Sequence, residues 1–465
     1  MPWHDGATPV RMQRVAVVAP REALRPALVR VADAGTVELD EAADAVASPG
    51  NAGQRLTRLH AAAAAPALSA RPPDLDALVR DGRTDLLAGE AQLEQHAAAA
   101  VVRDGVAALA GWTPVTAVAP LHDRLAALGG AVVPLPRPPG REPPTLLRPA
   151  GARRPFAPLV DTYATVPYAD VDPTVVAGLA YVVMFGAMFA DAGQGAVLVA
   201  VALALAAGRP RRLAGLRPIW PFIAGAGLAS CVFGFLYGEF FGPTGVLPVR
   251  WVAPLDEPVQ LLVAGVGLGA LLLAGAYALG TVNRWREGGW RLALYAPSGL
   301  AGAGLFLALG LVTAGWYWDT GWLLATGGGV AAVALGLALA GLLADSGGGA
   351  AGFLQAAVEL FDIVVRLGSN LVSFARLAAF GLTHAALGLV VWDATTALWG
   401  GGPVARAGAV LVFLIGNAVT FALEGLVAAV QALRLEYYEL FSRVFQGDGR
   451  PFQPWHVPVP EGVSP

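Results

Sequence analysis

Long apolar runs with almost no charge fill the chain after about residue 165, whereas the first third carries frequent Arg, Asp and Glu. Six of these runs are long enough to cross about 30 Å of hydrocarbon as helices. They lie at residues 218–240, 258–283, 292–316, 321–344, 352–392 and 407–441. A further run, 174–208, contains FADAGQG in its middle, so it can cross either once or twice.

The charged loops between the runs decide the number of spans, because cytoplasmic loops carry an excess of arginine. Arginines mark residues 209–217 and 284–291 as cytoplasmic, and the loops between and after them are acidic. With a cytoplasmic head the first run must then cross twice, which predicts eight spans and cytoplasmic N- and C-termini. Each half is short for a span, so we expect irregular backbone around Asp191 that is buried in protein.

The last two runs are longer than a perpendicular crossing requires, since 352–392 would reach about 60 Å as a helix. They predict two long, tilted, antiparallel helices that present a broad face within the membrane.

The first 165 residues predict a small α/β head with a helical hairpin. VAVVAP (15–20), a helical pattern that Gly35 can end, and VELDE (37–41) read as a βαβ-like fragment. Residues 41–110 show helical charge spacing interrupted by the turn signal ARPPD, which predicts two helices folded on each other. Residues 111–168 are rich in proline and predict a tether, apart from a second βαβ-like fragment near 116–133.

The predicted fold is therefore mainly α: a polytopic helical membrane domain, 166–455, a cytoplasmic head, 1–165, and a short tail, 456–465. The N-terminus lacks the apolar core and cleavage site of a signal peptide, which favours a cytoplasmic head.

A stripe of polar residues interrupts the apolar run at 352–392. Its members recur at spacings of 4, 3, 4 and 3, which places them on one helical face. They are Asp362, Arg366, Ser369, Ser373 and Arg376. A second arginine, Arg434, lies in the last run, after Glu424. Ionisable groups at membrane depth are costly and usually line an ion path or meet a charged partner, so the pattern predicts a route for protons or sodium ions.

Composition excludes several functions. Hydrophobic residues make up 56% of the chain and charged residues 14%, and all 31 basic residues are arginine. A Walker A loop needs a lysine, so the chain cannot hold ATP in that way. The single cysteine, Cys231, cannot form an intramolecular disulfide, and nothing resembles a nucleic-acid patch. The lack of lysine and the Ala, Gly and Pro content favour a GC-rich bacterial source, and no cofactor is expected.

Several motifs follow one another along the second two thirds of the chain. They are PPTLLRP (143–149), YATVPYADVDPT (163–174), MFGAMFADAGQG (184–195), FGFLYGEFFG (233–242), SFARLAAFGLTHAALG (373–388) and LEGLVAAVQALRLEYYELFSRVFQGDGRPFQPW (423–455). Together they resemble the membrane stator subunit of V-type and A-type rotary ATPases, called subunit a or subunit I. The head matches this 116 kDa subunit family only at its ends and is about half the expected length.

The resemblance implies a non-nucleotide-binding subunit that lies in the lipid bilayer beside a proteolipid c/K rotor ring. Peripheral-stalk E/G subunits would hold it, and the central-stalk C/d subunit is a further candidate partner. Arg376 would be the essential arginine that attracts the rotor carboxylate and separates two half-channels, with Arg434 as its companion.

Depth along the helices assigns the half-channels. We expect the outer one to contain Asp191, Glu239, His384 and Glu424. We expect the inner one to contain Glu359 and Asp362. Gln431 and Glu436 border one or the other, and Ser369 and Ser373 lie along the path. The chain departs from the family pattern at Ala190, Gln194 and Glu436, where glycine, histidine and histidine are usual.

Each of these side chains also has a purely structural interpretation. Arg366 can extend to the headgroups, the two serines can bond backbone carbonyls, and His384 can be a core histidine. Glu239 can be an interfacial loop charge. Two other functional classes stay open: a secondary transporter with ionisable residues at midplane, and a non-conducting scaffold derived from the stator.

Overall fold

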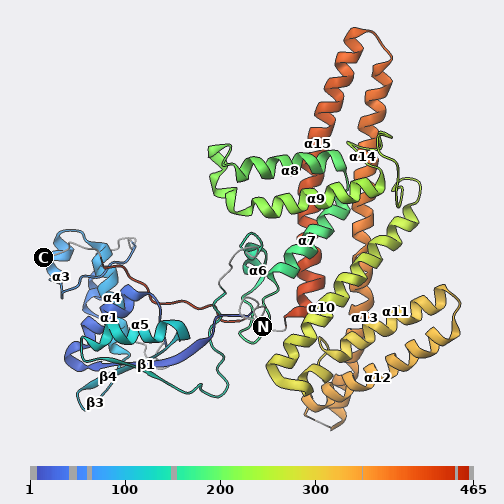
Figure 1. Cartoon of the computed structure of the whole chain (residues 1–465). Coiled ribbons are helices and arrows are strands. Elements are labelled where there is room, and N and C mark those ends of the chain that lie inside the picture. The colour runs from blue at the N-terminus through green and yellow to red at the C-terminus, as the bar shows by residue number, and fades with distance from the viewer. Residues whose placement is uncertain are drawn as a thin grey trace. The chain divides into compact units, whose positions relative to one another are not determined.

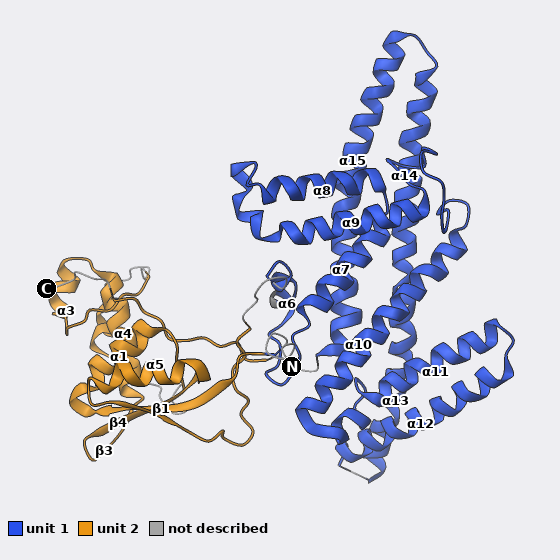
Figure 2. Ribbon diagram, in the orientation of Figure 1, with its two compact units in different colours: residues 1–8, 149–448 blue, residues 9–148, 449–465 orange. Residues whose placement is uncertain are grey.

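The computed structural model describes residues 8–40, 50–59, 65–147, 154–347, 349–445 and 449–459. The chain divides into two compact units (Figure 2). One consists of residues 1–8 and 149–448 and is called the membrane unit here. The other consists of residues 9–148 and 449–465 and is called the head.

The head is built on a five-stranded antiparallel sheet. Its strands are β1 (Met12–Pro20), β2 (Glu38–Leu39), β3 (Val101–Arg103), β4 (Val106–Pro114) and β5 (Ala131–Pro134). The strand order is β2-β4-β1-β5, with β3 paired to β4. Helix α1 (Leu24–Ala34) connects β1 to β2, and α5 (Val115–Ala126) connects β4 to β5. Strand β4 therefore lies between β1 and β2, the two strands of the first fragment, and β1 lies between β4 and β5, the two strands of the second. This is a split βαβ arrangement. Both predicted βαβ-like fragments are present.

Successive side chains of β1 point to opposite faces of the sheet, so its buried apolar side chains lie on one face. Val15 and Val17 are fully or almost fully buried, and they share a core with Leu28 of α1 and with Leu121 and Leu125 of α5. Gly35 ends α1 in the left-handed conformation, with φ of 57°, as its position in the sequence predicts.

The region between the two fragments contains the predicted pair of packed helices, and a short third helix lies between them in the sequence. It contains α2 (Asn51–Leu59), α3 (Leu75–Arg80) and α4 (Thr84–Ala98), and residues 41–49 and 60–64 of that prediction lie outside the described residues. Asp74 of the predicted turn caps α3 by accepting a hydrogen bond from the Asp76 backbone N–H at 2.9 Å. The second helix of the predicted hairpin, expected over residues 84–109, ends at Ala98, and the remaining residues form β3 and the first part of β4. Asp104 and Gly105, with φ of 50° and 79°, form a two-residue turn between β3 and β4, as Asp-Gly pairs favour.

The segment 449–459 packs in the head, although the sequence interpretation divided it between the membrane domain and a separate tail. The backbone N–H groups of Trp455 and Val457 donate to the carbonyls of Val37 and Ala32, at 2.8 and 3.2 Å. Val457 is fully buried. The head is therefore completed by residues from the far end of the sequence.

The membrane unit is helical throughout its described length, apart from connecting loops. Its elements are α6 (Ala157–Tyr163), α7 (Thr174–Met188), α8 (Ala192–Ala206), a 3₁₀ stretch (Arg211–Ile219), α9 (Trp220–Tyr237), α10 (Pro258–Tyr295), α11 (Leu300–Tyr317), α12 (Gly321–Asp345), α13 (Gly349–Ser373), α14 (Ala375–Trp399), α15 (Pro403–Leu435), a π-helix (Glu436–Phe441) and α16 (Ser442–Val444). Helices α8 and α9, α11 and α12, and α14 and α15 pack in pairs (Figure 1).

Among the described residues, six helical stretches are long and apolar enough to cross a membrane, while α7 and α8 are apolar but shorter. The chain is thus a polytopic helical membrane protein, as its hydropathy predicts. The eight-span count and the cytoplasmic termini stay predictions. The stretch 349–399, at 51 residues, is longer than expected and would extend roughly 75 Å, although a non-helical turn at Phe374 separates α13 from α14.

The expected loop at 284–291 is only partly present: most of these residues continue α10, but the helix breaks within this range at Gly288 and Gly289, whose φ and ψ angles are non-helical. Arg284, which the prediction used as a cytoplasmic loop marker, is buried. Its guanidinium lies 3.9 Å from the buried Asp170 carboxylate and 2.5 Å from that of Glu287.

Candidate functional site

The candidate site begins at the break between α7 and α8, where Asp191 is fully buried. Its Oδ1 accepts hydrogen bonds from the backbone N–H groups of Gln194 and Phe241, at 2.8 and 3.0 Å, and its Oδ2 accepts from that of Gly242 at 2.7 Å. Asp191 therefore caps α8 and fixes the loop after α9. The expected irregular backbone at this position is present and protein-buried.

Four ionisable residues from four separate parts of the sequence meet at this cap, Asp191 among them. A hydrogen bond joins His384 Nδ1 on α14 to the Glu424 carboxylate on α15. His384 Nε2 lies 4.0 Å from Asp191 Oδ2. Glu239, in the loop after α9, is close enough to His384 and Asp191 for direct electrostatic interaction. We call Asp191, Glu239, His384 and Glu424 the His384 cluster.

The His384 cluster is buried but not fully hydrogen-bonded. His384 and Glu239 are each 3% exposed. In the described part of the chain, Glu239 Oε2 and Glu424 Oε1 are buried without a hydrogen-bond partner. A carboxyl oxygen that has no hydrogen-bond partner and lies beside an imidazole can accept a proton or pass one on. The structure thus brings together all four residues predicted for the outer half-channel, while their role stays a prediction.

Asn417 on α15 was missed by the sequence interpretation. The Gln194 side-chain amide donates to Asn417 Oδ1 at 3.4 Å, which extends the polar contacts from the His384 cluster toward α15. The signal was present, because Asn417 is a lone amide in an apolar run.

The two predicted arginines lie at one level of the α14–α15 pair. The contact between His384 and Glu424 fixes the register of these antiparallel helices. Eight residues before His384 is Arg376, and ten residues after Glu424 is Arg434, so both lie about 12–15 Å along the helices from the His384 cluster. The two guanidinium groups are close enough to act on each other electrostatically.

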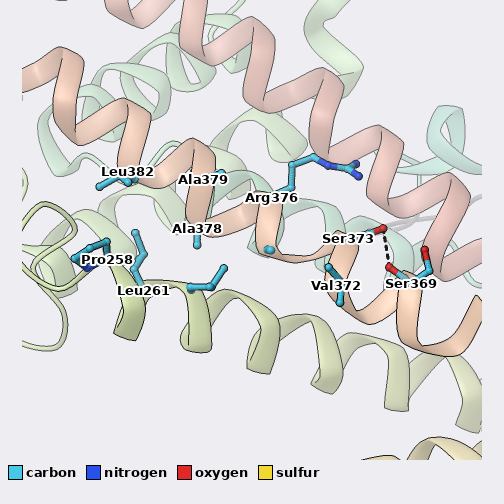
Figure 3. Close-up of a pocket in the computed structure, with 11 residues that line it drawn as sticks. Pro258, Leu261, Ser369, Val372, Ser373, Arg376, Ala378, Ala379 and Leu382 are labelled. Carbon is cyan, nitrogen blue, oxygen red and sulfur yellow. Dashed lines mark hydrogen bonds between the residues drawn. The ribbon is translucent and has the colours of Figure 1, made fainter. Parts of the chain in front are cut away.

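Arg376 is half-buried, and its Nη1 has no hydrogen-bond partner among the described residues. Its side chain borders an open pocket of about 710 Å³ that residues of α10 line on the opposite side. Figure 3 shows the Arg376 side chain extending away from Pro258 and Leu261 at the other end of this pocket. A guanidinium with an unused buried donor is available to an anionic partner.

Ser369 and Ser373 border the same pocket (Figure 3). The Ser373 hydroxyl donates to the Ser369 carbonyl at 3.1 Å, as a structural role predicts. Three of the five stripe residues therefore share one pocket although α13 ends between Ser373 and Arg376.

The residues predicted for the inner half-channel lie apart from Arg376. Asp362 and Arg366 are exposed and form an ion pair at 2.7 Å, and Glu359 is exposed and accepts a hydrogen bond from Gln355 at 2.9 Å. The buried carboxylates nearer the arginines are Glu436 and Glu439, both in the π-helix after α15.

Glu439, which the sequence interpretation missed, acts electrostatically on Arg376. Gln431 Oε1 is buried without a hydrogen-bond partner in the part of the chain that the structure describes. Among these described residues, no three His, Cys, Asp or Glu side chains are arranged to hold a metal ion.

A second polar contact set, also missed, joins the segment before α7 to the end of the last helix. Asn283 Oδ1 accepts from the Val171 backbone N–H at 3.0 Å, and its amide donates to the Val444 carbonyl at 3.3 Å. The Arg284–Asp170 pair lies next to it. This set fixes α16 and the segment before α7 against α10.

Comparison with known proteins identifies the family. The V-type ATPase 116kDa subunit family matches residues 102–254 and 353–457. The chain belongs to this family. The matched ranges of this V-type ATPase 116kDa family protein contain the whole His384 cluster, Arg376 and Arg434.

Similar proteins include the A-type ATP synthase subunits I of three archaea. That of Aeropyrum pernix is 30% identical over 366 residues, covering 67% of this chain and 50% of the relative. That of Thermococcus kodakarensis is 26% identical over 331 residues, covering 68% and 48%. That of Archaeoglobus fulgidus is 27% identical over 403 residues, covering 75% and 58%. The V-type ATPase 116kDa family chain thus spans about half the length of these relatives, and its bacterial origin stays a prediction.

Proposed function

We propose that this chain is the stator subunit of a rotary ATPase membrane sector, which passes H⁺ or Na⁺ along a proteolipid rotor ring. It would not bind nucleotide itself. The observation that carries the proposal is the placement of Arg434 on an exposed apolar stripe of α15, at the level of the half-buried Arg376 on α14.

On α15 the exposed apolar residues Leu423, Leu426 and Val430 follow helical spacing, and Arg434 continues that stripe. On α13 the exposed Val365 and Val372 lead toward Arg376, together with the exposed Ser369 of the polar stripe. A lipid-facing arginine at membrane depth is costly. An apolar partner that carries a carboxylate can cover the apolar stripe and pair with the arginines. A proteolipid rotor subunit has that chemistry.

The arrangement also suits a partner that must leave again. A permanent internal ion pair would compete with the rotor carboxylate, and in the described residues Arg376 Nη1 has no partner. Attraction in a low-dielectric setting is strong, but desolvation of both charges opposes it, so a passing carboxylate binds only transiently.

The His384 cluster supports an outer half-channel. The hydrogen bond between His384 and Glu424 allows a proton to pass between imidazole and carboxylate, and Asp191 holds the imidazole side of the cluster. The His384 cluster lies about 12–15 Å along the helices from the arginine level, on the side that we propose to be outer. Glu359 and Asp362 remain our candidates for the inner side, with Gln431 and Glu436 near the arginines.

Peripheral-stalk E/G subunits are the proposed partners of the head, with the central-stalk C/d subunit as a further candidate. The membrane is proposed to be the plasma membrane of a bacterium. The transported ion would couple to ATP hydrolysis or synthesis in the partner sector.

Purification of the tagged chain from its own membranes in mild detergent tests the proposal. We expect a small proteolipid ring and stalk subunits to co-purify. Recovery of the chain alone, with the ring present in the same membranes, would contradict the stator role and favour a scaffold or transporter.

A further inference from the structure

Glu436 begins the π-helix that follows α15 and is 1% exposed. Within the described chain, its Oε2 has no hydrogen-bond partner. The nearby Tyr181 hydroxyl does not supply one, because it donates to the Ala429 carbonyl at 3.2 Å. Leaving an ionised carboxylate buried without a partner is very costly, so this group favours its neutral acid form.

The Glu436 side chain borders a crevice of about 270 Å³ between α7, α10 and the π-helix. Apart from Glu436, the crevice is lined by apolar residues and glycine. Small residues keep it open: Ala177 and Ala180 on α7 and Gly275 on α10. A single helical turn of π type in an apolar helix is uncommon and frequently marks a functional position.

The mouth of the crevice faces outward from the helix bundle. Leu179 and Leu271 border it and are 63% and 70% exposed, whereas Glu436 at its inner end is buried. In a polytopic membrane protein, exposed leucines on two neighbouring helices face lipid. An apolar molecule dissolved in the membrane can therefore approach Glu436 from the side.

We propose that this crevice is a lipid-accessible site for small apolar reagents that react with carboxylic acids, and that Glu436 is its reacting group. A hydrophobic carbodiimide has the required chemistry. The acid transfers its proton to one carbodiimide nitrogen while its oxygen bonds to the central carbon. The acyl group then moves from that oxygen to nitrogen, the oxygen becomes a urea carbonyl, and no atom leaves. The product is a stable N-acylurea on Glu436.

The test uses the whole complex in mild detergent, treated with N,N′-dicyclohexylcarbodiimide at neutral pH and mapped by peptide mass spectrometry. We expect an adduct with the mass of the intact reagent on Glu436. Labelling of the exposed Glu359 should be at least about tenfold lower, because Glu359 lies outside the apolar crevice that takes up the apolar reagent, and water hydrolyses the activated intermediate at an exposed carboxyl. A water-soluble carbodiimide should reverse this preference.

Two controls separate access from reactivity. Glu436→Gln should remove the adduct. Gly275→Leu should reduce labelling while leaving the acid in place, because a Cβ at Gly275 meets no other atom within 4 Å and the added side chain fills the crevice. Preincubation with dicyclohexylurea, the unreactive analogue, should slow labelling in the unaltered chain.

An unlabelled Glu436 in an intact complex would overturn the proposal. So would labelling that neither Gly275→Leu nor the urea slows, since the reagent would then arrive by another route. The adduct is mapped on this chain and requires no ion transport, so its outcome is independent of the stator role.

Discussion

Replacing Asp191 with alanine should open the start of α8, because this carboxylate holds three backbone N–H groups that are otherwise without acceptors. Gln194 and Phe241 donate to one oxygen and Gly242 to the other. A buried donor left unsatisfied costs about 1–3 kcal/mol, so the loss of the acceptor of all three donors in Asp191→Ala should lower the free energy of local opening by roughly 3–9 kcal/mol. Asp191→Asn keeps one acceptor oxygen and should cost less.

The chain carries its own reporter for this opening. Its single cysteine, Cys231, lies on α9 with Sγ 3.5 Å from the Ala192 carbonyl, at the capped turn. Cys231 is partly exposed, so it reacts with a thiol reagent at a basal rate; the increase above that rate, with the labelled peptide identified by mass spectrometry, reports opening of the turn. Since 1.4 kcal/mol is about tenfold in an equilibrium constant, a loss of about 3 kcal/mol should raise the opening-dependent part of this rate on the order of 100-fold.

Asp393 provides the matched control, because it is an exposed aspartate on α14. Asp393→Ala should change the Cys231 rate less than about threefold, since exposed substitutions usually shift stability by under about 0.5 kcal/mol. A Cys231 rate in Asp191→Ala that equals that of the unaltered chain would refute the cap.

Three further expectations concern the His384 cluster and the head. Glu424→Gln removes the anionic partner of His384 and should lower ion transport by about 100-fold or more in a complex that still assembles, and an unchanged rate in reconstituted vesicles would contradict the relay. Gly105→Ala should destabilise the head by roughly 1 kcal/mol in denaturant unfolding, because Gly105 has φ of 79°, and no loss would argue against the turn. Burial raises the pKa of Glu90 above its usual 4.5, although Arg25 opposes the shift. The stability that Glu90 contributes is therefore complete below about pH 4.5 and falls as pH rises through the raised pKa, and Glu90→Gln should flatten that fall. A pH profile of head unfolding that keeps its full slope in the variant would show that other groups cause it.

The helical organisation was predictable because hydropathy is a local signal. The run expected at 321–344 corresponds to α12, and the strand expected at 15–20 lies within β1. The meeting of Asp191, Glu239, His384 and Glu424 could not follow from spacing, since these residues lie far apart in the chain. Depth along the predicted helices, together with the half-channel mechanism that the family resemblance implies, supplied that expectation.

The remaining differences arise from contacts that local patterns do not contain. Arg284 has the sequence signature of a loop charge, and only the return of the chain to Asp170 makes it a buried residue. The segment around Trp455 joins the head through hydrogen bonds to Val37, on the opposite end of the sequence. At Asp104, by contrast, the Asp-Gly signal was present, and helical charge spacing was given too much weight.

The most direct test of the stator role is ion transport by reconstituted complexes that carry Arg376→Gln. Arg406→Gln is the matched control, because Arg406 is exposed near the start of α15, away from the Arg376 pocket. We predict that Arg376→Gln lowers ATP-driven ion movement by about 100-fold or more while the rotor ring still co-purifies, and that Arg406→Gln transports normally. Normal transport by Arg376→Gln would contradict the account.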